Sequence, residues 1–524
     1  MVDSLWGDEF VIPETPKKQK KIIEKASKPK AVTITTEKAI KSKTIDIKQK
    51  IALIAENVYK ILGKYAERTV VIKTKEQLHD YIDAAIANGE IAIDTETNNS
   101  LVPLTCKLMG PCIYTPGQKN AYIPINHIDP DTRERLPDQL TEADVKEEFE
   151  RLHETLIIMH NAKFDYQVIK CTCDIPLKIY WDTFIGARLL NENEKAGLKE
   201  QYISKIDSSI EKYNIEHLFE KMEYAIFAPE LFALYAATDA FMTYELYKWQ
   251  KEQFSLPEHA RLYNLFQTVE MPIVTVTAEM ELYGVCIDAD YASRLSKKYH
   301  NKLYEIDKEI AIELAKYDDI VSKWRLTPEA NFKPSKGKSI VINGIEYAYM
   351  NASGGPGDTP YWYEKKSLRQ LSSTEAASLG LTATYGKSKN EQLENPISVT
   401  SPTQLAILLY DILKIGVIDK KAPRGTGEPI LEKLDIPLCK VILKKRGLEK
   451  IIGTYVDKLP ECVIPKTGRL HASFLQIGAD TGRFSSKDPN LQNIPSHLKE
   501  IRMLFKPSDG YVMVGSDFSL RKAG

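Results

Sequence analysis

The pattern of apolar and polar residues changes along the chain, and from Thr69 onward it alternates between the periods of strands and helices. The run TVVIKT predicts a strand, KEQLHDYIDAAIANG a helix and EIAIDTET a second strand. Two β-rich runs, CKLMGPCIYTPG and NAYIPIN, follow around a Pro-Gly turn. A helix near 141–154, the strand TLIIMHN and further helices to about residue 252 complete this part. The alternation predicts an α/β domain over 69–252.

From residue 253 the pattern becomes mainly helical and stays so to about 460, with a long charged helix at 291–316. In SPTQLAILLYDILKI, Ser401 is a suitable N-cap and Pro402 suits the first turn. Residues 326–396 interrupt this pattern because they are rich in Gly, Ser, Pro and Tyr. We interpret them as an inserted loop or a small irregular module.

The last part of the chain, 461–524, predicts β-structure again. The apolar run Tyr511–Val514 predicts a strand that leads into Asp517. A carboxylate at a strand end is a common position for a metal ligand, but a single carboxylate rarely makes a metal site.

The composition adds an N-terminal arm to this picture. A chain of 524 residues with 43% hydrophobic residues, 27% charged residues and a net charge of -1 is expected to form several domains and carries no overall nucleic-acid signal. Residues 17–50 are nevertheless rich in lysine, so we expect 1–68 to be a mobile basic arm with a short helix. The alternative is that the arm tethers the protein to a polyanion.

Cysteine usage and hydropathy point to an intracellular protein. The seven cysteines are scattered and odd in number, which is typical of reduced thiols and not of a disulfide framework. No apolar run is long enough to span a bilayer, and we expect no membrane association.

The strand EIAIDTET ends in two carboxylates that lie two residues apart. Asp94 and Glu96 therefore share one face of the strand. Alone this is weak, since the same spacing recurs at Asp307 and Glu309 in a segment predicted as an exposed helix. A capping or solvated acid at a strand end is the alternative interpretation of Asp94.

Two further segments place acids where a set of ligands would need them. MHNAKFDY puts Asn161 and Asp165 at a helix start after a buried strand, and LYAATDAFMTYELY puts Tyr235 and Asp239 on one helix face. Four acids without a comparable set of basic residues beside them imply divalent cations. Oxygen ligands suit Mg²⁺ or Mn²⁺, and two such ions about 3.5–4 Å apart can stabilise both oxygens of a phosphoryl displacement. Tyr235 is then placed to orient the attacking water.

The segments DTE, NAKFD and YAATD resemble the three exonuclease motifs of the DEDD superfamily, in the version with a tyrosine in the third motif. The resemblance implies a ribonuclease H-like 3′–5′ exonuclease domain that uses two Mg²⁺ or Mn²⁺ ions. Its catalytic residues would be Asp94, Glu96, Asp165, Tyr235 and Asp239. The four acids would hold the metal ions, and Asn161 and Phe164 would contact DNA.

The segment TGRFSSKDPNLQNIP resembles the TGRLSSxxPNLQNIP signature of family A DNA polymerases. SPTQLAILLYDIL and KKRGLEKIIGTYVDKLP are similar to helices of that family's thumb. The resemblance implies a multidomain α/β and α+β protein, with a mostly helical thumb at 253–460, interrupted at about 326–396, and the start of a palm at 461–524. It further implies that Arg483, Gln492 and Asn493 contact the primer-template, with phosphate contacts from Lys444, Lys445, Arg446 and Lys450. A solvated helix face explains these four basic residues equally well.

The run VMVGSDFS resembles the family's first palm motif, whose aspartate binds the catalytic magnesium ions. Asp517 matches that aspartate, Phe518 the aromatic residue and Ser519 the serine, but LRKAG replaces the expected QIELR. The family's fingers helix and second metal-binding aspartate are absent from this sequence. We therefore expect this chain to polymerise DNA only together with the missing part, for example a separate C-terminal polymerase fragment.

Three functions follow as hypotheses. The first is the N-terminal part of a family A DNA polymerase whose exonuclease removes nucleotides from single-stranded 3′ ends, in a bacterial cytoplasm or a phage-infected host. The second is an independent nuclease acting on RNA in the manner of ribonuclease D. The third is a non-catalytic subunit of a split polymerase that binds primer-template.

Overall fold

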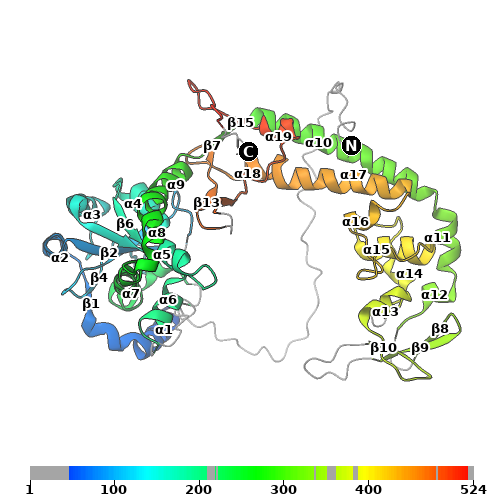
Figure 1. Ribbon diagram of the computed structural model, residues 1–524, viewed down its shortest axis with the longest axis horizontal. Coiled ribbons are helices and arrows are strands. Elements are labelled where there is room, and N and C mark those ends of the chain that lie inside the picture. The colour runs from blue at the N-terminus through cyan, green and yellow to red at the C-terminus, as the bar shows by residue number, and fades with distance from the viewer. Residues whose placement is uncertain are drawn as a thin grey trace. The chain divides into compact units, whose positions relative to one another are not determined.

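The computed structural model describes residues 47–98, 100–208, 219, 222–334, 338–350, 361–381, 387–478 and 482–516 (Figure 1). Nearly all of the lysine-rich arm, as well as Asp517, Phe518 and Ser519, lies outside these residues, so the expectations for them stay predictions. Within the predicted arm, the helix α1 covers Ile47–Leu62, and a 3₁₀ turn at Gly63–Arg68 follows. The chain divides into two units, Met1–Ile54 and Ala55–Gly524, and the elements below belong to the second. None of the described helices is long and apolar enough to cross a membrane.

A six-stranded sheet with the order β1-β4-β3-β2-β5-β6 forms the centre of the first region. Its strands are β1 (Thr69–Val71), β2 (Glu90–Thr97), β3 (Leu108–Tyr114), β4 (Asn120–Tyr122), β5 (Leu156–Met159) and β6 (Ile179–Asp182). β3 runs antiparallel to both β2 and β4, whereas β5 and β6 run parallel to β2. This central strand order, with one antiparallel strand beside the first long strand, is that of a ribonuclease H-like fold, as predicted.

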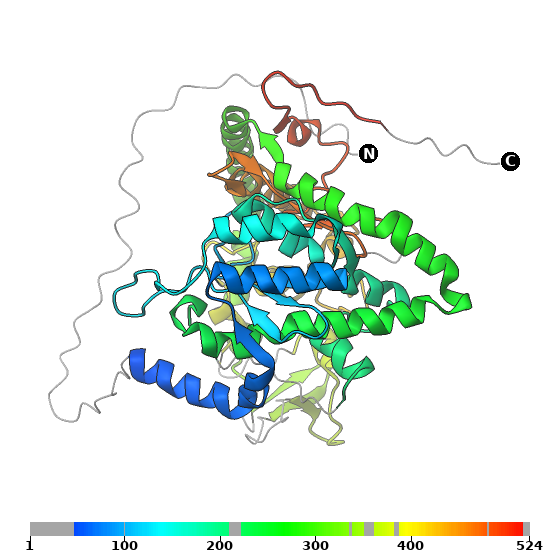
Figure 2. The same ribbon diagram turned by 90° about the vertical axis from the view of Figure 1, so that its left-hand side faces the viewer.

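Helices cover both faces of this sheet. The long helix α7 (Pro229–Phe254) packs across β1 to β5, and most of its side chains are buried. On the other side lies α2 (Lys75–Asn88), which crosses in front of the strands in Figure 2. The sequence sets the ends of α2, since Thr74 and Gln77 form a capping box and Gly89 closes the helix at a φ of 73°. Beside α2 lie α3 (Glu142–Phe149) and α4 (Ala162–Cys173).

The strand β6 was not predicted from the sequence. Its segment is short and mixed in character, and Trp181 is buried only because α7 and the residues near Phe266 pack over it. Along the chain, two helices separate β6 from α7: α5 (Thr183–Leu190) and α6 (Leu198–Lys205).

The predicted helical region begins with α8 (Ala260–Leu265) and α9 (Met271–Tyr283) and continues with two long helices. These are α10 (Ala289–Ala315) and α17 (Pro437–Ile451), which pack side by side (Figure 1). The predicted start at SPTQL is confirmed: Ser401 caps α15 (Pro402–Ala406), and its hydroxyl accepts a hydrogen bond from the Gln404 amide at 3.4 Å.

The segment predicted as irregular contains a small folded module. Its antiparallel sheet, in the order β10-β9-β8, consists of β8 (Ser339–Ile342), β9 (Ile345–Met350) and β10 (Tyr361–Glu364). Buried aromatic residues form its core, with Tyr349 packed edge-on against Trp362 at 5.2 Å between ring centroids. The interpretation as a small module agrees with this sheet, but its regular strands were not predicted because Gly- and Ser-rich stretches between them obscured the alternating aromatic pattern.

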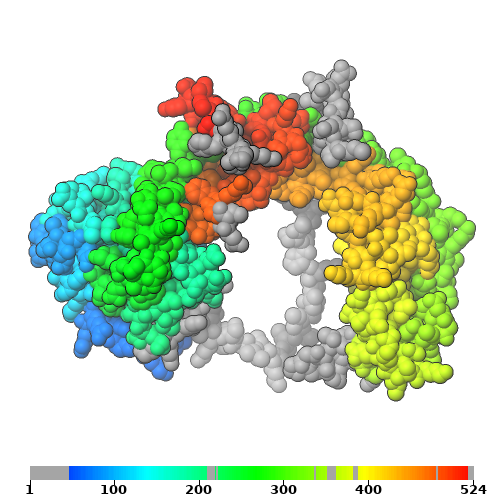
Figure 3. Space-filling model, viewed as in Figure 1, coloured from blue at the N-terminus to red at the C-terminus, as the bar shows by residue number. Residues whose placement is uncertain are grey.

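The C-terminal β-structure is sparse. A third sheet has the order β11-β12-β7-β15 and begins with β11 (Val463–Ile464). In it, β7 (Val285–Ile287) pairs with β12 (Arg469–Leu470) and with β15 (Phe505–Lys506). The predicted strand at Tyr511–Val514 is wrong: these residues lack regular structure, and their side chains are between 64% and 86% exposed. The red atoms of this segment project from the surface in Figure 3. A strand needs backbone partners, and no described residue pairs with this run.

Candidate active site

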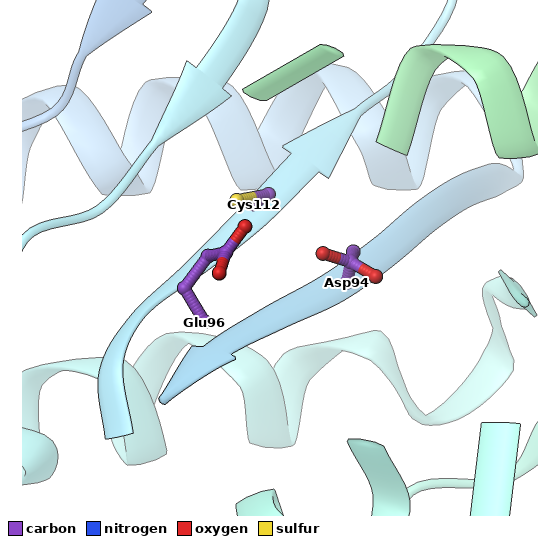
Figure 4. Close-up of side chains that lie close together, drawn as sticks. All are labelled: Asp94, Glu96 and Cys112. Carbon is purple, nitrogen blue, oxygen red and sulfur yellow. The ribbon is translucent and has the colours of Figure 1, made fainter. Parts of the chain in front are cut away.

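The central strand β2 carries the first two predicted site residues. Asp94 and Glu96 lie on one face of β2, and Cys112 on β3 lies directly opposite Asp94 in the antiparallel ladder. One carboxylate oxygen of each acid and the Cys112 sulfur lie within 4.8 Å of one another. Figure 4 shows these three side chains close together. Burial, together with Glu96 and Asp94, raises the pKa of the Cys112 thiol well above its usual range. The thiol therefore stays protonated at neutral pH, and the carboxylates remain the groups suited to a cation.

The second segment follows the neighbouring strand β5. Asn161 precedes α4 in a left-handed conformation, with a φ of 58°, and Asp165 lies in the first turn of that helix. Asp165 is buried, and its Oδ1 accepts hydrogen bonds from the Thr95 amide at 2.9 Å and the Thr95 hydroxyl at 2.5 Å. Because Thr95 stands between Asp94 and Glu96, these bonds hold Asp165 beside the first pair of acids.

A further acid, Asp182, supports this arrangement from the end of β6. Its carboxylate accepts hydrogen bonds from the amides of Asn161 and Ala162, both at 2.9 Å, and from the Phe184 amide at 2.8 Å. Burial raises the pKa of Asp182 to about 6, although these amides oppose the shift. Asp182 thereby fixes the start of the helix that carries Asp165.

The third segment lies on α7. Tyr235 is buried and Asp239, one turn further along, is partly exposed. Asp239 Oδ2 pairs with the ammonium of Lys199 on α6 at 3.2 Å, whereas Oδ1 is buried and has no hydrogen-bond partner among the described residues. Lys199 is thus one basic residue beside the four acids, which the sequence did not reveal. Lys199 escaped notice because it lies 40 positions before Asp239 in sequence and has no motif of its own.

The electrostatics show that the four predicted acids are close enough to interact. Burial, followed by Asp165, Asp239 and Glu96, raises the pKa of Asp94 well above its ordinary value. Burial also raises the pKa of Asp165 to about 7, against the hydrogen bonds from Thr95. Mutual repulsion of this kind is relieved by a cation, and the orphaned Asp239 oxygen offers an open ligand position. The residues present therefore fit a divalent metal ion with oxygen ligands.

Four residues of this site were missed by sequence reasoning, and they share one property: each reaches the site through tertiary contacts. They are Thr95, Cys112, Asp182 and Lys199. Thr95 had a detectable signal, because it lies inside the DTE segment. The other three carry no local pattern that separates them from ordinary residues.

The predicted nucleic-acid contacts lie elsewhere, on exposed segments. Arg483, Gln492 and Asn493 are exposed, and so is Lys450 on α17. The Asn490 side chain accepts hydrogen bonds from the amides of Gln492 and Asn493 and so shapes this loop. The assignment of these four residues to DNA binding stays a prediction.

Two of the basic residues on α17 have partners within the chain. Lys445 is buried and pairs with Asp307 at 2.5 Å and with Glu449 at 3.3 Å. The Arg446 guanidinium donates to the Thr426 carbonyl at 2.5 Å. The charge of Lys445 is thus compensated within the chain, whereas the Arg446 guanidinium donates to a neutral carbonyl and keeps its charge. The phosphate contacts of both residues stay predictions.

Comparisons with known proteins cover the same two regions. A 3′-5′ exonuclease family model matches residues 69–253, and a DNA polymerase family A model matches residues 367–521. DNA polymerase I of Borreliella burgdorferi is 27% identical over 462 residues, which is 86% of this chain and 40% of the relative. DNA polymerase I of Pseudomonas aeruginosa is 28% identical over 449 residues, or 82% of this chain and 39% of the relative. The chain thus spans about two fifths of the length of these relatives.

A solved structure supports the fold alone. The POL domain of Pol1 from M. smegmatis, in complex with DNA primer-template and dNTP, aligns with a TM-score of 0.53 at 17% identity. The alignment covers 84% of this chain and 59% of that one. Sheet order and carboxylate placement define a ribonuclease H-like domain of the exonuclease type. Residues 69–253 match the 3′-5′ exonuclease family, residues 367–521 match DNA polymerase family A, and the chain is similar to DNA polymerase I over most of its length.

Proposed function

We propose that residues 69–252 hydrolyse single-stranded 3′ ends of DNA with two Mg²⁺ or Mn²⁺ ions. The observation that carries this proposal is the convergence of four acids, because Asp165, Asp239 and Glu96 together with burial raise the pKa of Asp94. A group of buried acids that destabilise one another is costly unless a cation compensates them. The match to the 3′-5′ exonuclease family supports the same reading.

The side chains of this chain would divide the work. Asp94, Glu96, Asp165 and Asp239 hold the metal ions, which stabilise the charge that develops on the attacking and leaving oxygens. Tyr235, one helical turn before Asp239, orients the water that attacks the terminal phosphodiester. Asn161 and Phe164 lie at the start of α4, on the side from which Asp165 reaches the site, and would contact the terminal nucleotides.

We propose that DNA polymerisation is carried out by this chain together with the rest of the polymerase domain. The family A match includes Arg483, Gln492, Asn493 and Asp517, which we assign to primer-template binding and to one metal position of the polymerase site. The matched relatives contain more than twice the length covered here, and nucleotide incorporation would need the rest of that polymerase domain. A separate C-terminal fragment that supplies it is a proposed partner. The setting is the cytoplasm of a bacterium or a phage-infected host.

The exonuclease is tested with end-labelled single-stranded DNA and a matched RNA, each with Mg²⁺ and with a chelator. We expect shortening of the DNA from its 3′ end with Mg²⁺ alone, and its loss in Asp94→Ala plus Glu96→Ala protein. The matched control is Asp318→Ala plus Asp319→Ala, because these two acids lie exposed at the start of α11 (Asp318–Arg325). Undiminished cleavage in the first variant contradicts the site, and a strong preference for RNA contradicts the substrate.

A further inference from the structure

Lys199 occupies a position inside the acidic site. It is the second residue of α6, and its Nζ lies 3.2 Å from Asp239 Oδ2 and 4.9 Å from the centroid of the Tyr235 ring. The side chains of Lys199 and Asp239 are 31% and 16% exposed, so the pair is largely shielded from water. The ammonium therefore contacts both members of the pair on α7.

The two oxygens of Asp239 are in different states. Oδ2 faces the ammonium, whereas Oδ1 is buried without a hydrogen-bond partner among the described residues. A buried carboxylate needs a compensating charge, and the Lys199 ammonium supplies one at Oδ2. One charge cannot compensate the acids of the whole site, which leaves the remaining oxygen available to a second cation.

We propose that Lys199 is a positioning residue that holds the Asp239 carboxylate and competes with a divalent ion for it. This inference rests on the metal site of the proposed function. A metal ion that binds the open Oδ1 of Asp239 is repelled by the ammonium that pairs with Oδ2, because the two positive charges then lie on one carboxylate. Lysine suits this role, since its charge is compact and its four-carbon chain is flexible enough to move aside.

Removal of the Lys199 charge is expected to increase the affinity for metal ions, which is not what loss of a structural residue usually does. Loss of an ordinary structural lysine would leave metal binding unchanged or weaken it, as the site loosens. Loss of a competing charge tightens metal binding while the metal-free protein becomes less stable, because the acids then repel one another without compensation. Metal affinity is therefore expected to rise while the free energy of unfolding of the metal-free protein falls.

The experiment measures Mn²⁺ binding to the full chain at neutral pH by electron paramagnetic resonance of the free ion. We expect the dissociation constant of Lys199→Gln to fall about tenfold, since a unit charge near the site is removed. Lys199→Arg keeps the charge and should bind close to wild type. Lys205→Gln is the matched control, because Lys205 lies on the same helix and pairs with Glu194 at 2.7 Å instead. Urea unfolding with a chelator should show Lys199→Gln to be the least stable of these three variants.

The outcomes separate this inference from the function on which it rests. If Lys199→Gln binds Mn²⁺ as wild type does, or more weakly, while Asp94→Ala plus Glu96→Ala abolishes binding, competition by Lys199 is refuted and the metal site stands. If wild-type protein binds no Mn²⁺, both the site and the competition are refuted. Tighter binding in Lys199→Gln but not in Lys205→Gln supports the proposal even if the variant is partly destabilised.

Discussion

Asp165 is held against Thr95 by two hydrogen bonds, from the Thr95 amide at 2.9 Å and from its hydroxyl at 2.5 Å. These bonds join α4 to β2 within the site, because Thr95 stands between Asp94 and Glu96 in sequence. Thr95 is therefore a positioning residue: it holds the Asp165 carboxylate, although its own side chain is neutral.

Thr95→Val removes the hydroxyl while keeping the shape of the side chain. A hydrogen bond to a charged group contributes about 1.5–3 kcal/mol, so we expect a loss of this order in the free energy of unfolding with metal bound. The exonuclease rate should fall by about tenfold, since Asp165 loses one of its two fixed partners. Urea unfolding and a gel assay of labelled DNA measure the two effects. Thr95→Ser, which keeps the hydroxyl, should stay near wild type in both, and equal losses in the two variants would contradict the role.

The raised pKa of Asp165 predicts the pH dependence of the metal-free protein. Burial raises this pKa to about 7 from an ordinary value of 3.8, so the folded state holds the proton more tightly than the unfolded state does. Stability is therefore greatest below the ordinary value and falls as pH rises toward 7. We expect the free energy of unfolding in chelator to decrease between about pH 4 and about pH 7. Asp165→Asn cannot titrate and should show a smaller decrease, measured by urea unfolding at several pH values.

Mg²⁺ should reverse this trend, since protons and the metal ion compete for the same carboxylates. The stabilisation by Mg²⁺ is expected to grow as pH rises through the raised pKa of Asp165. A stabilisation that is constant over this range would show that the metal binds elsewhere.

The predictable parts of the fold are those encoded locally. The order of strands and helices over 69–252, the cap at Ser401 and the three acidic segments follow from periodicity, capping residues and motif spacing. β6 was missed because its burial depends on α7 and the residues near Phe266, which lie far away in sequence. Conversely, Tyr511–Val514 has the pattern of a strand but lacks the neighbour that would make it one.

The site follows the same division. The motif residues could be predicted because each motif keeps its members a few positions apart on one strand or helix. Lys199 could not be predicted, because only the packing of α6 against α7 brings it beside Asp239. Asp182 was missed for a related reason, since its role depends on how β6 places it beside the start of α4.

The exposed apolar run at Tyr511–Val514 predicts self-association. Val512 and Val514 are 81% and 86% exposed, and consecutive exposed apolar residues are prone to pair with another chain. We expect wild-type protein to form concentration-dependent oligomers, and Val512→Lys plus Val514→Lys to reduce them. Sedimentation velocity over a range of protein concentrations measures the effect. Lysine substitution at the exposed Leu326, which is 85% exposed outside this run, is the control and should change nothing. Equal association in all three proteins would contradict the prediction.

The buried carboxylate of Asp411 is expected to stabilise the helical region through its ion pairs. Its carboxylate is almost fully buried and pairs with both Lys389, at 2.6 Å, and the Arg424 guanidinium. Removing one member of a buried ionic group leaves the others uncompensated, which costs about 3–5 kcal/mol. We expect Asp411→Ala to lower the free energy of unfolding by this amount, measured with urea and followed by circular dichroism. Asp319→Ala is the matched control, because Asp319 pairs with Lys323 at 2.6 Å while both side chains are exposed. That pair should contribute little, since water and salt screen it, so similar losses in the two variants would show that burial does not determine the effect.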